Sequence, residues 1–250
     1  IQAFRTEAGD TLIDTARLVL GAGHGEFPRA AYAPGTPRQA RELTRRALQT
    51  AHRFQSPAIL MTDQFLADQR RNEPEPDLTL RPIDTHVLEN PPGDYVRYAP
   101  AEDGVSPRAV PGADAVVVCD SDEHDEQGHI TEDFDTRIRL QDKRMAKQRG
   151  MIEQFLPPER YGPDDPERIL LTWGSTCGPA REAVDLANND GGSVAMVHFA
   201  QVWPIDVEVA RRALGEPDTG AEVISVEGNA TAQFAGVLRE LGVLGQCGTM

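Results

Sequence analysis

In the last third of the chain, compact apolar runs alternate with stretches in which apolar residues recur every three to four positions. Three compact apolar runs have the length and composition of buried strands, namely Arg168–Thr172, Val194–Phe199 and Val223–Val226. Stretches with apolar residues three to four positions apart follow them and predict helices that begin at Pro179, Asp206 and Ala230. In the first of these helices, we expect Ala183, Leu186 and Ala187 to face inward. The alternation predicts a three-layer α/β domain.

The N-terminal part shows the same alternation once. Ala30–Ala33 has the pattern of a short strand, and Thr36 followed by Pro37 is a start signal for an amphipathic helix. The apolar run Ala58–Met61 then predicts a second buried strand. Strand, helix and strand within about thirty residues form a βαβ unit with parallel strands. Upstream, residues 11–20 have roughly helical spacing, which the glycines from Gly21 onward end.

Between these parts, hydrophobic periodicity disappears. Residues 72–112 are rich in proline and predict a long surface connector. Ala115–Cys119 predicts a short strand, and the acidic loop Asp120–Gly128 follows it. A charged helix is expected from Thr131 to Phe155, with an intermittent apolar stripe that includes Ile138. The pattern therefore divides the chain into two α/β modules, residues 1–71 and 165–250, joined by residues 72–164.

The composition narrows the possible partners. The 250 residues carry a formal net charge of −15, which argues against nucleic acid and anionic membranes because both require basic patches. No apolar run is long enough to span a membrane. The chain begins with Ile1 and shows no leader, so we expect a fragment or processed chain of a cytoplasmic protein. Its three cysteines are widely separated, so we expect any redox metal on another chain.

The loop Gly21–Arg29 is the strongest candidate for chemistry. It holds three glycines, His24 and Glu26, and it ends at Phe27-Pro28, so it suits neither a helix nor a central strand. Shaped loops at strand ends commonly carry the functional groups of α/β proteins. His24 and Glu26 are therefore the catalytic candidates, with His24 as a proton-transfer group. The alternative is that His24 only bonds the loop or a partner subunit.

Other polar groups each allow a structural and a functional interpretation. Asp63 ends a strand and either caps the next turn or contacts a ligand, and capping is favoured. Gly174–Thr176 either forms a tight turn or binds a phosphate. Cys177 is either a buried thiol or a reactive one. Trp173 and Trp203 suit core or interface positions. The acidic side chains and histidines between Glu123 and His129 either bind a hard metal ion or lie in solvent, and we expect no metal.

Several motifs keep their order and spacing along nearly the whole chain. They are Gly23-His-Gly-Glu-Phe-Pro-Arg29, Ala33-Pro-Gly35, Ser56-Pro57 with Thr62–Asp68, Gly104–Gly112, Asp122–His129, Trp173–Thr176, Trp203-Pro204 and Val226–Phe234. In this series the chain resembles the alpha subunits of 2-oxoacid:ferredoxin oxidoreductases, most of all the 2-oxoglutarate type. Each motif is weak alone, and the ordered series is specific.

The resemblance implies thiamine diphosphate-dependent oxidative decarboxylation of a 2-oxoacid to an acyl-coenzyme A, with electrons passed to ferredoxin. It implies a beta subunit that shares the thiamine diphosphate and Mg²⁺, and an iron–sulfur cluster on a partner subunit. Residues 1–71 would end the pyrimidine-binding domain, and residues 165–250 would form a transketolase C-terminal-like domain. The family's thiamine-activating glutamate would lie before residue 1, so this chain alone should be inactive. The alternative is a non-catalytic α/β module for subunit assembly.

Overall fold

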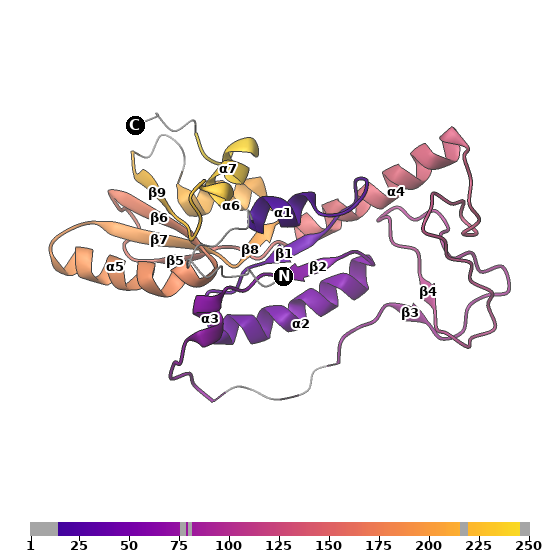
Figure 1. Ribbon diagram of the computed structural model, residues 1–250, viewed down its shortest axis with the longest axis horizontal. Coiled ribbons are helices and arrows are strands. Elements are labelled where there is room, and N and C mark those ends of the chain that lie inside the picture. Colours follow the sequence, from indigo (N-terminus) through magenta and orange to yellow (C-terminus); the bar gives the residue numbers. More distant parts are fainter. Residues whose placement is uncertain (1–14, 76–78, 80–81, 216–219, 246–250) are drawn as a thin grey trace, which may run out of the picture.

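The computed structural model describes residues 15–75, 79, 82–215 and 220–245. They form an elongated α/β molecule in which two sheets lie side by side and a long helix extends away from them (Figure 1). The larger sheet has the order β5-β7-β6-β9. It contains β5 (Glu159–Tyr161), β6 (Arg168–Trp173), β7 (Val194–Phe199) and β9 (Glu222–Val226). β6 is parallel to both β7 and β9, and only β5 runs antiparallel.

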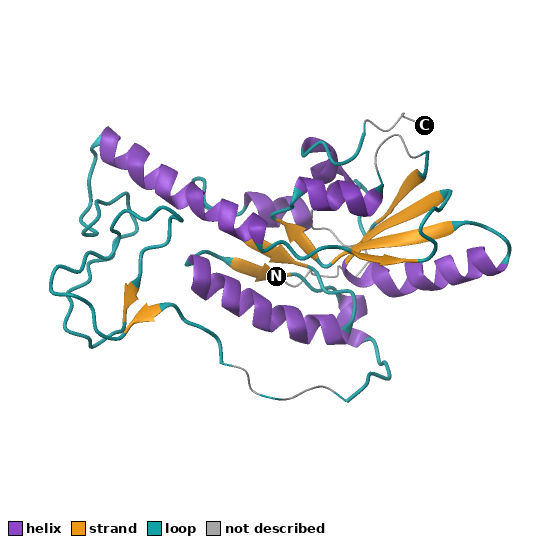
Figure 2. Ribbon diagram, turned by 180° about the vertical axis from the view of Figure 1, so that it is seen from behind, coloured by secondary structure: helices purple, strands orange, loops and turns teal. Residues whose placement is uncertain are grey.

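Helices cover both faces of this sheet, as Figure 2 also shows. On one face α5 (Cys177–Asn189) packs through Cys177, Ala180 and Val184 against Val194 and Met196. On the other face lie α6 (Val207–Leu214) and α7 (Gln233–Glu240). Their buried side chains pack with the opposite side chains of β6 and β7, Ile169, Leu171, Val197 and Phe199. The predicted three-layer α/β architecture is confirmed.

The inward face of α5 differs from the one expected from the sequence. Leu186 is 61% exposed, Ala183 is also exposed and Ala187 is half-buried, whereas Val184 is buried against the sheet. The helix begins at Cys177, two residues before the expected start at Pro179. With Cys177 and Ala180 on the sheet, helical periodicity places Val184 next on the same face.

The smaller sheet has the order β2-β1-β8. β1 (Ala30–Tyr32) and β2 (Ala58–Leu60) are parallel and are connected by α2 (Pro37–Phe54), so the predicted βαβ unit is confirmed. Thr36 caps α2 by accepting a hydrogen bond from the backbone N–H of Gln39. The third strand, β8 (Gln201–Trp203), comes from the C-terminal part and pairs antiparallel with β1. The C-terminal part of the chain therefore contributes a strand to the smaller sheet, which the sequence pattern did not predict.

Outside these two sheets lie four short elements and the long helix. They are α1 (Thr15–Gly21), α3 (Gln64–Asp68), β3 (Val87–Leu88), β4 (Arg108–Ala109) and α4 (Phe134–Glu153). β3 and β4 pair in parallel within the connector and form a small sheet of their own, and Asp133 caps α4. None of the described helices combines the length and apolarity that crossing a membrane requires.

Two expectations about the connector are wrong. Residues 115–119 form no strand, and Val116 is 91% exposed, because the segment pairs with no other strand among the described residues. Ile138, expected in the apolar stripe of α4, is 59% exposed. The buried side chains of α4 are Thr136, Leu140 and Met151. A run of valines indicates β propensity, but burial depends on the neighbours that the fold supplies.

Candidate functional site

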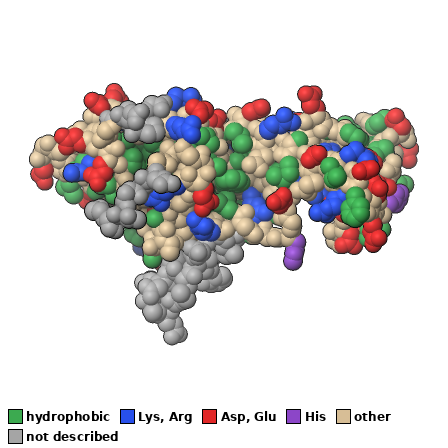
Figure 3. All heavy atoms as spheres, turned by 90° about the horizontal axis from the view of Figure 1, so that it is seen from above, with side chains coloured by type: hydrophobic (Ala, Val, Ile, Leu, Met, Phe, Trp, Pro, Cys, Tyr) green, Lys and Arg blue, Asp and Glu red, His purple; other side chains and the backbone are tan. Residues whose placement is uncertain are grey.

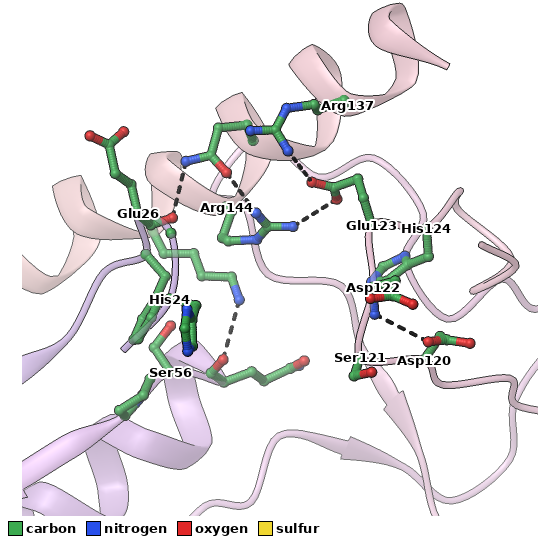
Figure 4. A pocket seen from close by; sticks show the side chains of 16 residues that line it. His24, Glu26, Ser56, Asp120, Ser121, Asp122, Glu123, His124, Arg137 and Arg144 are labelled. Atoms are coloured by element: carbon green, nitrogen blue, oxygen red, sulfur yellow. Dashed lines mark hydrogen bonds and ion pairs between the residues drawn. The ribbon is translucent and has the colours of Figure 1, made fainter. Parts of the chain in front are cut away.

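A cleft of about 770 Å³ lies where the loop Gly21–Arg29 faces α4 and the acidic loop 120–128 (Figure 4). His24–Phe27 and Gln55–Pro57 line one side, and Asp120–His124 line the other. Side chains of α4, spaced three to four residues apart, line it as well, namely Arg137, Gln141, Arg144 and Lys147. The cleft therefore collects polar groups from four separate segments of the chain.

Arg29 fixes the conformation of the glycine loop. Its side chain is 6% exposed, and its Nη1 donates hydrogen bonds to the carbonyl oxygens of Val19, at 3.0 Å, and Ala22. These carbonyls lie at the C-terminal end of α1, where a cation is favourable. The guanidinium also lies 4.3 Å from the centre of the Phe27 ring. A buried arginine thus anchors both ends of the loop that presents His24.

The structure places both predicted catalytic residues in the cleft. His24 and Glu26 are exposed and line it, and the backbone carbonyl of Glu26 accepts a hydrogen bond from Gln141 of α4 at 3.0 Å. His24 hydrogen-bonds to no other described residue, and the Glu26 carboxylate is turned away from it (Figure 4). The two side chains therefore do not act as a pair, and the catalytic role of each stays a prediction.

The acidic loop opposite is held by its own side chains and by α4. Glu123 accepts a hydrogen bond from Arg144 at 2.9 Å and is also paired with Arg137, 3.6 Å away. Asp125 accepts backbone hydrogen bonds from Gln127 and His129, and the bond from His129 is the largest cause that lowers its pKa. No three acidic, histidine or cysteine side chains of the described residues gather in a way that could hold a metal ion. The carboxylates of Glu123 and Asp125 serve the loop itself.

A second polar group joins the ends of the two sheets. Asp63 caps α3 by accepting from the backbone N–H of Leu66 at 2.8 Å, which confirms the capping interpretation. Its other carboxylate oxygen accepts a hydrogen bond from Ser175, in the turn after β6. The Thr176 hydroxyl donates to the Trp173 carbonyl oxygen. Ser175 and Thr176 are thus used within the protein, which favours the tight-turn interpretation of Gly174–Thr176.

The remaining candidates are structural. Cys177 is 3% exposed, and burial raises the pKa of its thiol to about 11, so it is not an activated nucleophile. Trp173 packs against the main core and donates from Nε1 to Glu227 at 3.1 Å. Trp203 lies on β8 and also packs against that core. Both tryptophans occupy the core positions expected from the sequence.

Sequence reasoning missed the polar centre at the end of α2. Gln55 adopts a left-handed conformation after α2, and its side chain donates to the Ser106 carbonyl oxygen and accepts from Arg97 at 2.8 Å. Its backbone carbonyl oxygen accepts from Lys147 of α4 at 3.3 Å. The sequence holds only two lysines, Lys143 and Lys147, one helical turn apart, and that spacing was the available signal.

Comparison with known proteins places the chain in a family, although no protein-family model matches it. The alpha subunit of 2-oxoacid:ferredoxin oxidoreductase 1 from Sulfurisphaera tokodaii is 31% identical over 219 residues, which cover 85% of this chain and 34% of that protein. The alpha subunit of 2-oxoacid:ferredoxin oxidoreductase 2 from Aeropyrum pernix is 33% identical over 226 residues, which cover 87% of this chain and 34% of that protein.

A solved structure agrees with these relatives. The 2-oxoglutarate:ferredoxin oxidoreductase from Magnetococcus marinus, with 2-oxoglutarate, coenzyme A and succinyl-CoA bound, matches with a TM-score of 0.76 and 28% identity. The match covers 89% of this chain and 39% of that one. The chain spans about a third of the length of the curated relatives it matches. It belongs, over that span, to the family of 2-oxoacid:ferredoxin oxidoreductase alpha subunits.

Proposed function

We propose that the chain is part of the alpha subunit of an enzyme that oxidatively decarboxylates a 2-oxoacid to an acyl-coenzyme A and passes the electrons to ferredoxin. The observation that carries the proposal is the identity of 31–33% to such alpha subunits over 85–87% of the chain. The structural neighbour favours 2-oxoglutarate as the substrate, because that enzyme holds 2-oxoglutarate and succinyl-CoA.

The cofactors of the proposed reaction require more than this chain. Among the described residues, no three acidic, histidine or cysteine side chains gather to hold a metal ion, so this part of the chain offers no ready-made metal centre. Cys119, exposed, and Cys177, buried, are the free cysteines among the described residues, and a cluster needs four cysteine ligands. We therefore propose that the beta subunit and other parts of the enzyme hold thiamine diphosphate, Mg²⁺ and the iron–sulfur cluster.

Assembly with a beta subunit tests the proposal. We expect the complete alpha subunit that contains this sequence, co-purified with its beta subunit and loaded with thiamine diphosphate, to reduce viologen when both a 2-oxoacid and coenzyme A are present. A substrate panel should give the highest kcat/KM with 2-oxoglutarate. An intact, cofactor-loaded complex without 2-oxoacid-dependent reduction would reject the proposal and leave the chain as an assembly module.

The same complex tests the two loop residues. If His24 transfers a proton, His24→Gln should lower kcat by about 10²-fold or more and change the pH profile, because glutamine cannot take up a proton. Glu26→Gln should lower activity similarly if its carboxylate acts as the acid or base. Ser121 lines the opposite side of the cleft. The variant Ser121→Ala is therefore the control, and we expect it to keep full activity. Wild-type turnover in His24→Gln would reject proton transfer by His24 and leave the loop with a structural role only.

A further inference from the structure

The two lysines of the chain occupy an unusual environment for so acidic a protein. Lys143 and Lys147 lie one turn apart on α4, and both are partly buried. Lys143 Nζ donates to the Tyr98 carbonyl oxygen at 2.9 Å, and Lys147 Nζ donates to the Gln55 carbonyl oxygen at 3.3 Å. Neither pairs with a carboxylate of the described residues. Two ammonium groups thus sit on backbone oxygens without an opposite charge at contact distance.

Two arginines add to the same cluster. Arg97 donates to the Gln55 side chain at 2.8 Å and lies over the Tyr98 ring, and Arg144 lies on α4 between the lysines. Burial first, and repulsion from these neighbours second, lower the pKa of each lysine to about 8. Asp103 is the carboxylate that partly offsets the charge at Lys147. Glu126 does the same at Lys143. Partly buried cations that have no carboxylate at contact distance cost folding free energy, and such a cost is typical of sites that a ligand completes.

The cluster opens to solvent through the cleft. Lys147 and Arg144 line the cleft, whereas Lys143 and Arg97 do not. The carboxylate of Glu123 is occupied by Arg137 and Arg144. Asp120 and Asp122 lie across the cleft from His24 and Ser56 (Figure 4). Because Lys147 bonds to the residue just before Ser56, the end of the cleft at His24, Ser56 and Lys147 is the cationic end.

We propose that this cationic end binds the anionic group, carboxylate or phosphate, of a small molecule. Lys147 Nζ donates to the anion, and a ring N–H of the exposed His24 imidazole adds a second donor. Asp120 and Asp122 lie at the opposite end, so a ligand has to enter with its anion pointing toward α4. Acidic and basic side chains are both scattered over the face of the molecule that Figure 3 shows. Because the whole chain carries a formal net charge of −15, a cationic end of the cleft is a local departure from its overall charge.

Anion-dependent stabilisation of the complete alpha subunit that contains this sequence tests the proposal at pH 7. The probes are 2-oxoglutarate for a carboxylate and coenzyme A for a phosphate, each compared with sodium chloride of equal ionic strength. We expect one of them to raise Tm and to bind measurably in calorimetry. The choice of probes rests on the proposed function, but binding is read on the alpha subunit without turnover, so an enzyme that lacks activity would leave this result intact.

Variants of the two lysines separate local binding from general charge. Lys147→Gln should weaken the bound probe about tenfold or more, since a charge-assisted hydrogen bond is lost. Lys143→Gln, the matched control outside the cleft, should weaken it no more than about threefold. Without a probe, Lys147→Gln should melt at the wild-type temperature or above, because the substitution removes a partly buried charge that has no carboxylate at contact distance. Failure of both probes to stabilise the wild type beyond salt, or equal losses in the two variants, would overturn the proposal.

Discussion

Glu227→Ala should destabilise the C-terminal domain more than any other removal of a single acidic side chain from the described residues. Glu227 directly follows β9 and is half-buried, and each of its carboxylate oxygens accepts more than one hydrogen bond. The donors are Trp173 Nε1, Ser225 Oγ, Asn229 Nδ2 and the backbone N–H groups of Phe234 and Ala235, at distances from 2.7 to 3.1 Å. One carboxylate thus ties β6, β9 and the first turn of α7 together.

Loss of that carboxylate leaves several donors without partners. The helix start is the most sensitive, because Ala232 before α7 has no side chain that could cap it. We expect a loss of about 2–4 kcal/mol in the free energy of unfolding, measured by urea denaturation. Glu222→Ala on the same strand removes only an exposed ion pair with Arg168 and should cost less than about 0.5 kcal/mol. Equal midpoints for the two variants would contradict this role for Glu227.

The pH dependence gives an independent check on Glu227. Burial alone would raise the pKa of this carboxyl, but the hydrogen bonds from Ala235, Phe234, Asn229 and Ser225 outweigh it and lower the pKa below 4.5. A lowered pKa in the folded state means that the stabilisation is complete above pH 4.5 and is lost as the pH falls through the lowered value. The stability difference between the wild type and Glu227→Gln should therefore shrink on acidification.

The strands that the sequence predicts correctly are those whose own residues form a continuous apolar run. β6 and β7 are continuous apolar runs and sit at the centre of the larger sheet, so the runs alone located them. β8 escaped prediction because it is three residues long and contains Gln201, whose buried amide bonds to Leu156 and Pro204. Residues 115–119 show the reverse case, in which a run of valines predicts a strand but stays exposed because no partner strand pairs with it among the described residues.

The candidate site likewise contains one part that the sequence predicts and one part that it does not. The glycines around His24 mark a shaped loop in any fold, so the loop was identifiable from sequence. Lys147 was not, because its importance comes from Gln55 and Arg97, which lie far away in the sequence and meet it only in the folded chain. The motif Val226–Phe234 was recognised as a family signature. Its physical reason, the hydrogen bonds that Glu227 accepts, required the coordinates.

Gly35→Ala should force apart the junction at which the two sheets meet. A methyl group on Gly35 would lie 2.5 Å from Cys177 Cβ, 2.8 Å from the Gly174 carbonyl oxygen and 2.9 Å from His198 Nε2. Cys177 and His198 are buried and belong to the larger sheet and its helix, whereas Gly35 follows β1 of the smaller sheet. None of these neighbours is the free end of a flexible side chain, so the backbone has to move.

We expect Gly35→Ala to lower the free energy of unfolding by about 3 kcal/mol, at the upper end of the cost of overpacking. Gly178→Ala is the control, because a methyl group there meets no atom within 4 Å and alanine favours the helix α5, so stability should stay level or rise. Cys177 reports the site directly: its buried thiol, with a pKa of about 11, should react slowly with a thiol reagent in the wild type and faster in Gly35→Ala. Peptide mass spectrometry distinguishes Cys177 from the other cysteines. An unchanged modification rate at Cys177 together with wild-type stability would mean that the close approach of the two sheets at Gly35 is not needed for the fold.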